Sequence, residues 1–137
     1  MRNETDFFHL VIEEIKQLKT RVQISISEIP EDCSGFLLTF KANSPAHSYI
    51  ELSPDGLGIR TEEKRVISSN AAVGFYWFRR GSLFLESSKR MVQENNRVNN
   101  EFYLCPLYNY LINDGLHVRT KQVDKMHVLG TPDELSF

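Results

Sequence analysis

The chain has 137 residues, enough for one domain, and 41% of them are hydrophobic, so it can bury a core. Sixteen Lys and Arg against eighteen Asp and Glu give a net charge of -2, which lacks the basic excess typical of nucleic-acid and membrane-surface binders. No apolar run reaches the ~20 residues of a membrane helix. Cys33 and Cys105 have no metal-binding spacing, and we expect reduced, packed thiols in a cytoplasmic protein.

The first part of the chain shows a helical pattern followed by two strand patterns. Apolar residues recur at helical spacing over residues 7–18, which predicts an amphipathic helix. Apolar and polar residues alternate over 22–27, which predicts a half-exposed strand ending near Pro30. The continuous apolar run GFLLTF at 35–40 predicts a strand buried on both faces, as in a parallel sheet.

A hairpin and a second buried strand are predicted next. Residues 47–52 and 57–60 flank the turn sequence Ser53-Pro54-Asp55-Gly56, which favours a hairpin. The run AAVGFYWF at 71–78 is apolar throughout and predicts another strand covered on two faces. Gly74 inside this run indicates close approach of a neighbouring backbone or of a ligand.

The remainder alternates helix and strand. Ser82 is a suitable cap for a helix running to about residue 94. After an Asn-rich turn, a second helix opens at Glu101, has Pro106 in its first turn and stops at Gly115. Residues 116–123 read as a strand, and the capping box at 131–134 starts a last helix. Alternating helices and strands predict an α/β fold.

Few polar residues stand out as candidates for chemistry. The four histidines share no metal spacing, so we predict no metal site from them. Glu63 and Lys64 follow the hairpin, and Glu101 opens a predicted helix. Taken alone, the first two read as a solvated loop pair, and Glu101 as an acid favoured by the helix dipole.

Four motifs in order change that interpretation. They are EEK at 62–64, AAVGFYWF at 71–78, NNEFYLCPLYNYLI at 99–112 and LGTPDEL at 129–135. Together they resemble the C-terminal half of bacterial GT-A-like sugar-phosphate nucleotidyltransferases of the capsule and cell-surface precursor type. The resemblance covers residues 35–137 and leaves 1–34, a helix and a strand, weakly matched. It implies a partial Rossmann-like mixed sheet with flanking helices that lacks the N-terminal nucleotide-binding half.

The resemblance also implies a reaction and a site. Such enzymes transfer a nucleoside monophosphate from a nucleoside triphosphate to a sugar phosphate, release pyrophosphate and use Mg²⁺. Lys64 would pair with the acceptor phosphate, Glu63 and Glu101 would bind acceptor hydroxyls, and Gly74 would let the acceptor lie against the strand.

Two departures from the family pattern qualify what is expected of this chain. The glycine-rich triphosphate loop is absent, and residues 126–130 carry no metal-binding aspartate, although Asn3 to Asp6 echo a metal-binding segment of the family. We therefore expect an incomplete enzyme that is inactive on its own, with no catalytic residue assigned, and the alternative is a non-catalytic binding or assembly module. Two strands needing cover on both faces predict a homo-oligomer.

Overall fold

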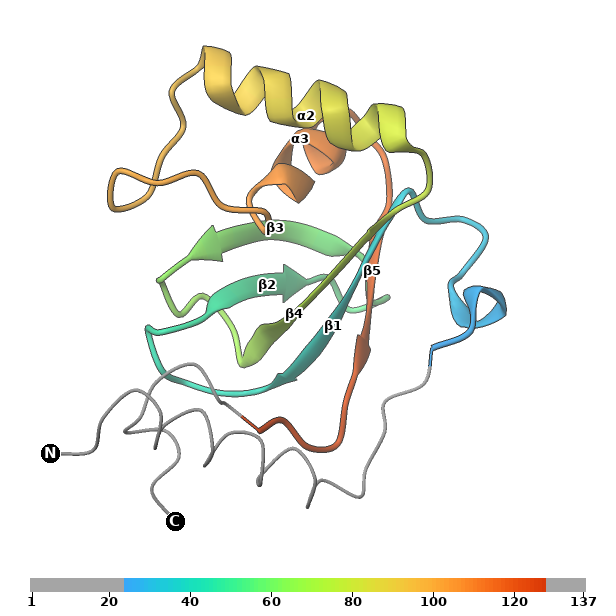
Figure 1. Ribbon diagram of the computed structural model, residues 1–137. Helices are drawn as coiled ribbons and strands as arrows, with labels where there is room; N and C mark the ends of the chain where they lie inside the picture. Colours follow the sequence, from blue (N-terminus) through green and yellow to red (C-terminus); the bar gives the residue numbers. More distant parts are fainter. Residues whose placement is uncertain (1–23, 128–137) are drawn as a thin grey trace, which may run out of the picture. The chain divides into compact units, whose positions relative to one another are not determined.

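The computed structural model describes residues 24–127, and residues 25–124 form one compact unit. This unit holds a five-stranded sheet with strand order β3-β2-β4-β1-β5 and two α-helices (Figure 1). The elements are η1 (Ile26–Glu28), β1 (Gly35–Lys41), β2 (Ser48–Leu52), β3 (Gly58–Glu63), β4 (Asn70–Phe78), α2 (Gly81–Gln93), α3 (Leu107–Asn113) and β5 (Val118–Gln122).

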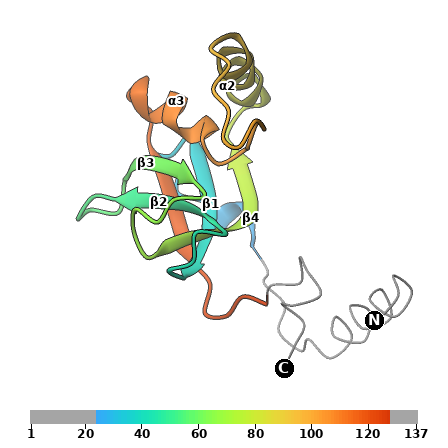
Figure 2. The same cartoon turned by 90° about the vertical axis from the view of Figure 1, so that its left-hand side faces the viewer.

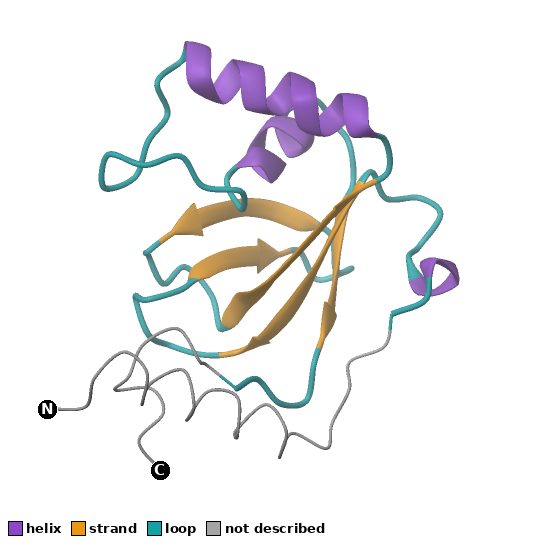
Figure 3. Ribbon diagram, in the orientation of Figure 1, coloured by secondary structure: helices purple, strands orange, loops and turns teal. Residues whose placement is uncertain are grey.

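The sheet is mixed. β1 pairs parallel with β5, whereas β1 with β4, β4 with β2 and β2 with β3 pair antiparallel. Both α-helices lie on the same side of this sheet (Figures 2 and 3). The predicted α/β class, a mixed sheet with flanking helices, is therefore confirmed.

The hydrophobic core between α3 and the sheet explains why the sequence of β1 is mostly apolar. β1 is buried from Gly35 to Thr39, as predicted. One hydrophobic cluster joins β1, β2, α3 and β5 through Leu37, Ile50, Cys105, Tyr108, Leu111 and Val118. Tyr108 is fully buried, and its hydroxyl lies 3.0 Å from the carbonyl oxygens of Phe36 and Trp77. This single side chain therefore ties α3 to the two central strands.

The predicted hairpin is present as β2 and β3. Ser53 closes the turn, because its amide donates to the Leu57 carbonyl at 2.8 Å and its hydroxyl accepts from the Leu57 amide at 3.1 Å. Gly56 adopts φ +83°, a conformation open to glycine. The turn chemistry read from the sequence thus predicts both the hairpin and its position.

β4 is a strand as predicted, but it is not covered on both faces. Ala72 pairs with Thr39 and Tyr76 with Leu37, so three residues of β4 face the single residue Leu38 between those pairs. Gly74, in the middle of this bulge, has φ +96° and is exposed, and Phe75 is 38% exposed. The bulge lifts the centre of the strand out of the ladder, which hydrophobicity alone does not reveal.

Three further predictions are corrected. Residues 26–28 form the 3₁₀ helix η1 and not a strand, because Ser25 and Glu28 make a reciprocal capping box. α2 begins at Gly81 with Arg80 at the N-cap, so Ser82 lies inside the helix. α3 begins at Leu107, and Glu101 therefore precedes the helix by a full loop.

Three further predictions within residues 24–127 are confirmed. β5 and the helix stop at Gly115, with φ +78°, are present, and Cys33 and Cys105 are buried free thiols. Across this described range, no helix combines the length and apolarity needed to cross a membrane. The predicted helix at 7–18 and the capping box at 131–134 lie outside the described residues.

Candidate functional site

Glu63 is the last residue of β3 and is buried, with 6% of its surface exposed. It stands opposite Ser48 in the β2–β3 ladder, and the Ser48 hydroxyl donates a hydrogen bond to the Glu63 carboxylate. A buried carboxylate needs such partners to offset its lost hydration. Glu63 is therefore part of the folded interior, and the solvated loop pair expected from sequence alone is wrong for this residue.

Lys64 follows directly and has a left-handed backbone with φ +55°. Its amide donates to the His47 carbonyl at 3.1 Å, and its Nζ donates to the Ala46 carbonyl at 2.7 Å. Nζ also lies 3.7 Å from Glu63 Oε1, and the side chain is 38% exposed. An ammonium has three donors, so this partly exposed group keeps capacity for a ligand. A left-handed non-glycine residue is uncommon and strained, and such strain concentrates at functional sites.

The end of β3 that carries these residues is held by α3. Asn109 Oδ1 accepts from the Thr61 amide at 2.7 Å, and Asn109 Nδ2 donates to the Thr61 carbonyl at 3.0 Å. The Asn109 side chain thereby makes the two backbone hydrogen bonds that a neighbouring strand would make to Thr61 at the outer edge of β3. The Thr61 hydroxyl donates to the Cys105 carbonyl at 3.0 Å, which fixes the loop before α3 to the same point.

Glu101 is positioned by a short turn of its own. Val98 and Glu101 form an isolated antiparallel bridge around Asn99 and Asn100, both of which have positive φ. Two left-handed residues at the tip are what a tight two-residue hairpin turn requires, and asparagine tolerates that conformation. The Asn-rich stretch thus explains why the chain turns here, and Glu101 projects from a turn and not from a helix.

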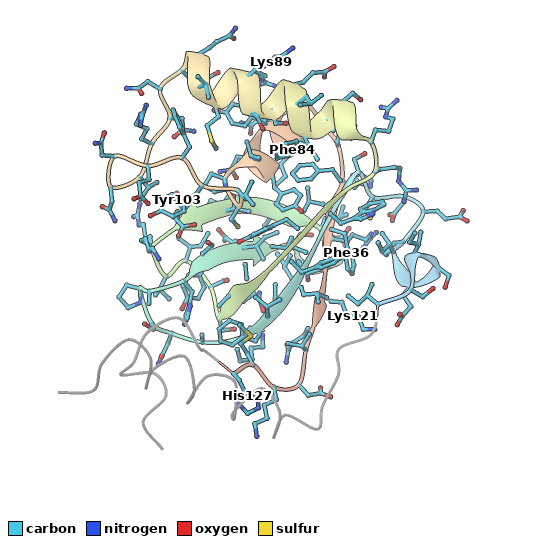
Figure 4. The ribbon with its side chains drawn as sticks, viewed as in Figure 1. Phe36, Phe84, Lys89, Tyr103, Lys121 and His127 are labelled. Atoms are coloured by element: carbon cyan, nitrogen blue, oxygen red, sulfur yellow. The ribbon has the colours of Figure 1, made fainter. Side chains whose placement is uncertain are left out.

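Tyr103 brings Lys64 and Glu101 together. Its hydroxyl donates to Glu101 Oε2 at 2.9 Å, while Lys64 Nζ lies 5.9 Å from the centroid of its ring. The Tyr103 side chain lies beside β3 (Figure 4). Three groups from two distant segments therefore converge on one surface, with Glu63 beside Lys64. Tyr103 was not among the site residues predicted from the sequence, although it stands within the EFY part of the third motif.

The interior side of this site is formed by Tyr76 and Cys105. Burial raises the pKa of the Tyr76 phenol, and the neighbouring Cys105 and Glu63 raise it further. Burial, assisted by Glu63, raises the pKa of the Cys105 thiol to about 12, so this thiol stays protonated at neutral pH. A thiol that stays protonated is a poor nucleophile, so Cys105 is unsuited to covalent catalysis.

Gly74 lies two residues before Tyr76 on β4. A Cβ added there would meet no atom within 4 Å, so the space beside Gly74 is open. Neither Lys64 nor Glu101 has an atom within 4 Å of that added Cβ, so the structure does not bring Gly74 into contact with them.

The described residues offer no ligand set for a metal. Within residues 24–127, no three His, Cys, Asp or Glu side chains gather as a metal-binding group. His47 packs edge-on against Phe40, with ring centroids 5.1 Å apart, and His117 Nδ1 lies 3.7 Å from Asp32 Oδ2.

Comparison with known proteins bears on the fold. The crystal structure of a nucleoside-diphosphate-sugar pyrophosphorylase from Vibrio cholerae RC9 matches 90% of this chain with a TM-score of 0.72 and 24% sequence identity. The match covers 59% of that protein, so the chain spans less than two thirds of its length. No protein-family model matches the sequence, and a search of curated proteins finds no match. The chain therefore has a fold similar to that of this Vibrio cholerae protein.

Proposed function

We propose that this chain binds the phosphorylated acceptor of a nucleotidyl-transfer reaction, with a sugar phosphate as the acceptor class. In the complete reaction, an acceptor phosphate oxygen attacks the α-phosphorus of a nucleoside triphosphate and pyrophosphate leaves. The observation that carries the proposal is the convergence of Lys64, Tyr103 and Glu101 on one surface beside buried Glu63. The similar fold of the Vibrio cholerae protein supports the reaction class.

Each group has a role that its surroundings allow. The Lys64 ammonium is partly exposed and can pair with a phosphate as a point charge. The exposed Glu101 carboxylate can accept hydrogen bonds only, which suits the hydroxyl groups of a sugar. The buried Glu63 carboxylate, in contrast, is bonded to Ser48 and lies behind Lys64. The open space beside Gly74 leaves room for a ring against β4. The site as a whole carries more acceptors than cations, so it favours a hydroxyl-rich acceptor with one phosphate over a polyphosphate.

The nucleoside triphosphate and Mg²⁺ would need groups beyond these. Mg²⁺ would neutralise developing phosphate charge when bound, but residues 24–127 contain no cluster of three carboxylate, His or Cys groups that could hold it. Within the same range, no glycine-rich loop stands between a strand and a helix to cradle a triphosphate. The role proposed for the described residues is therefore recognition of the acceptor.

A binding module without transfer chemistry is the second candidate. This candidate is favoured because the described residues include groups suited to bind the acceptor substrate but no triphosphate-binding loop. Adding a nucleoside triphosphate and Mg²⁺ to the acceptor-bound chain separates the candidates. Pyrophosphate release that disappears in Lys64→Ala indicates transfer, whereas unchanged acceptor binding with no release indicates the module.

The proposal is tested by calorimetric titration of the full chain with glucose 1-phosphate, mannose 1-phosphate and N-acetylglucosamine 1-phosphate. We expect at least one to bind, and Lys64→Ala to weaken it about 10- to 100-fold, since a lost charge-assisted contact is worth about 1.5–3 kcal/mol. Lys89→Ala is the matched control, because Lys89 points away from the sheet on the outer side of α2 (Figure 4). Absence of binding by all three compounds, or equal loss in both variants, contradicts the proposal.

A further inference from the structure

We propose that Tyr103 is a positioning residue of this acceptor site, which orients Glu101 through its hydroxyl and places Lys64 through its ring. The inference rests on the proposed function, and it assigns a role to a side chain that the sequence motifs did not single out. Its basis is the pair of contacts by which Tyr103 joins Glu101 to Lys64, two residues that lie 37 positions apart in the chain.

The first contact fixes the Glu101 carboxylate. Glu101 is exposed and lies in a turn, so without a partner its side chain would sample several rotamers. The Tyr103 hydroxyl donates to Oε2 at 2.9 Å. Among the described residues, Oε1 has no hydrogen-bond partner, which leaves that oxygen to accept from a ligand hydroxyl. Holding one oxygen directs the other and removes conformational entropy that ligand binding would otherwise have to overcome.

The second contact places the Lys64 ammonium. Nζ lies 5.9 Å from the centroid of the Tyr103 ring, within the range of a cation–π attraction. Nζ also donates to the Ala46 carbonyl at 2.7 Å, so two elements constrain a side chain with four rotatable bonds. The ring therefore limits where the charge can lie without using any of its hydrogen-bond donors.

The loop that carries Tyr103 is built as a rigid support. Arg97 Nε donates to Asn95 Oδ1 at 2.7 Å, its Nη1 donates to the Asn100 carbonyl at 3.1 Å, and its guanidinium lies 4.0 Å from the centroid of the Phe102 ring. The Val98 and Glu101 backbones exchange hydrogen bonds of 2.9 Å in both directions. A loop with this much internal bonding holds Tyr103 and Glu101 in a fixed relation.

Two substitutions separate the two contacts. Tyr103→Phe removes the hydroxyl and keeps the ring, whereas Tyr103→Leu removes both. Tyr110→Phe is a matched control, because Tyr110 donates a bond of the same length, 2.9 Å, to Glu94 at the other end of the same loop. Binding of the tightest of the three hexose 1-phosphates and of inorganic phosphate is then measured by calorimetry on the full chain.

We expect Tyr103→Phe to weaken hexose 1-phosphate binding about five- to tenfold and to leave inorganic phosphate within twofold, because only Glu101 is affected. Tyr103→Leu should weaken both ligands. In a Glu101→Ala background, which removes the acceptor, Tyr103→Phe should add less than twofold, since its effect runs through Glu101. Equal loss for both ligands in Tyr103→Phe, or a loss of the same size in Tyr110→Phe, overturns the inference and leaves the acceptor proposal standing.

A readout without ligand completes the test. The hydrogen bond to Glu101 raises the pKa of the Tyr103 phenol, because ionisation would break that bond and set two anions together. NMR titration of ring-labelled tyrosine should therefore show a lower Tyr103 pKa in Glu101→Gln. An unchanged pKa overturns the positioning role. Failure of all three hexose 1-phosphates to bind, with the pKa change present, instead overturns the acceptor function and leaves the Tyr103–Glu101 link established.

Discussion

β1 and β4 are neighbours in the sheet and have similarly apolar sequences, yet they differ in burial and in the regularity of their pairing. β1 is buried from Gly35 to Thr39, whereas β4 bulges at Gly74 and exposes Phe75. Each strand contains a glycine, and the two glycines are needed for opposite reasons. At Gly35 an added Cβ would meet the Tyr108 ring at 2.6 Å, while at Gly74 it would meet nothing and the backbone has φ +96°.

The difference teaches how this sheet combines a core with a binding surface. β1 packs closely against α3, and the missing side chain of Gly35 leaves space for the Tyr108 ring. β4 loses part of its ladder at the bulge, where Gly74 supplies a left-handed conformation. The regular strand β1 therefore provides core contacts, whereas the interrupted strand β4 leaves Gly74 and Phe75 exposed.

The largest difference in the free energy of unfolding should come from replacing one phenylalanine on each strand with alanine. Phe36 on β1 is 1% exposed and lies inside the fold (Figure 4), whereas Phe75 on β4 is 38% exposed. Phe36→Ala should lower the free energy of unfolding by about 3–5 kcal/mol, the usual cost of emptying a core position. Phe75→Ala should cost about 1 kcal/mol or less. Urea denaturation of both variants checks this, and equal losses would show that β4 is as buried as β1.

Gly35→Ala comes next. The Tyr108 ring cannot move aside easily, because its hydroxyl is bonded at 3.0 Å to two strand carbonyls and its ring stacks on Phe78 at 4.9 Å. Overpacking against such a ring should reduce the free energy of unfolding by about 2–3 kcal/mol. Thermal denaturation measures the loss. A change below about 0.5 kcal/mol would mean that β1 and α3 separate without cost and that the proposed rigidity of this region is absent.

Gly74→Ala should have a smaller effect with a different cause. No atom obstructs the added methyl group, but a non-glycine residue at φ +96° is strained, and the loss should be about 1 kcal/mol. Chemical denaturation quantifies it. If Gly74→Ala proves as destabilising as Gly35→Ala, the open space beside β4 is filled in solution, and the proposed acceptor surface is not available.

Sequence patterns predicted the elements that depend on local chemistry. The hairpin follows from Ser53 to Gly56, β1 from its apolar run and the stop of α3 from Gly115, because each signal lies within a few residues. Glu63 and Lys64 were identified by resemblance, and the structure adds that Glu63 is buried. The bulge at Gly74 and the role of Tyr103 depend on partners 36 or more positions away, namely Leu38 and Lys64, which no local pattern contains.

The smallest effect concerns Lys64, where a proposed binding residue occupies a backbone conformation that suits glycine. Its φ of +55° persists because its amide is bonded to His47 and its Nζ to Ala46 and the Tyr103 ring. Lys64→Ala keeps the strain and loses the side-chain contacts, whereas Lys64→Gly also relieves the strain. Lys64→Gly should therefore be more stable than Lys64→Ala by about 0.5–1 kcal/mol, although both lose hexose 1-phosphate binding equally. Denaturation and calorimetry on the same two samples make the comparison. Equal stability of the two variants would show that the backbone at residue 64 is relaxed, and the left-handed turn would then not be strain held in place for the site.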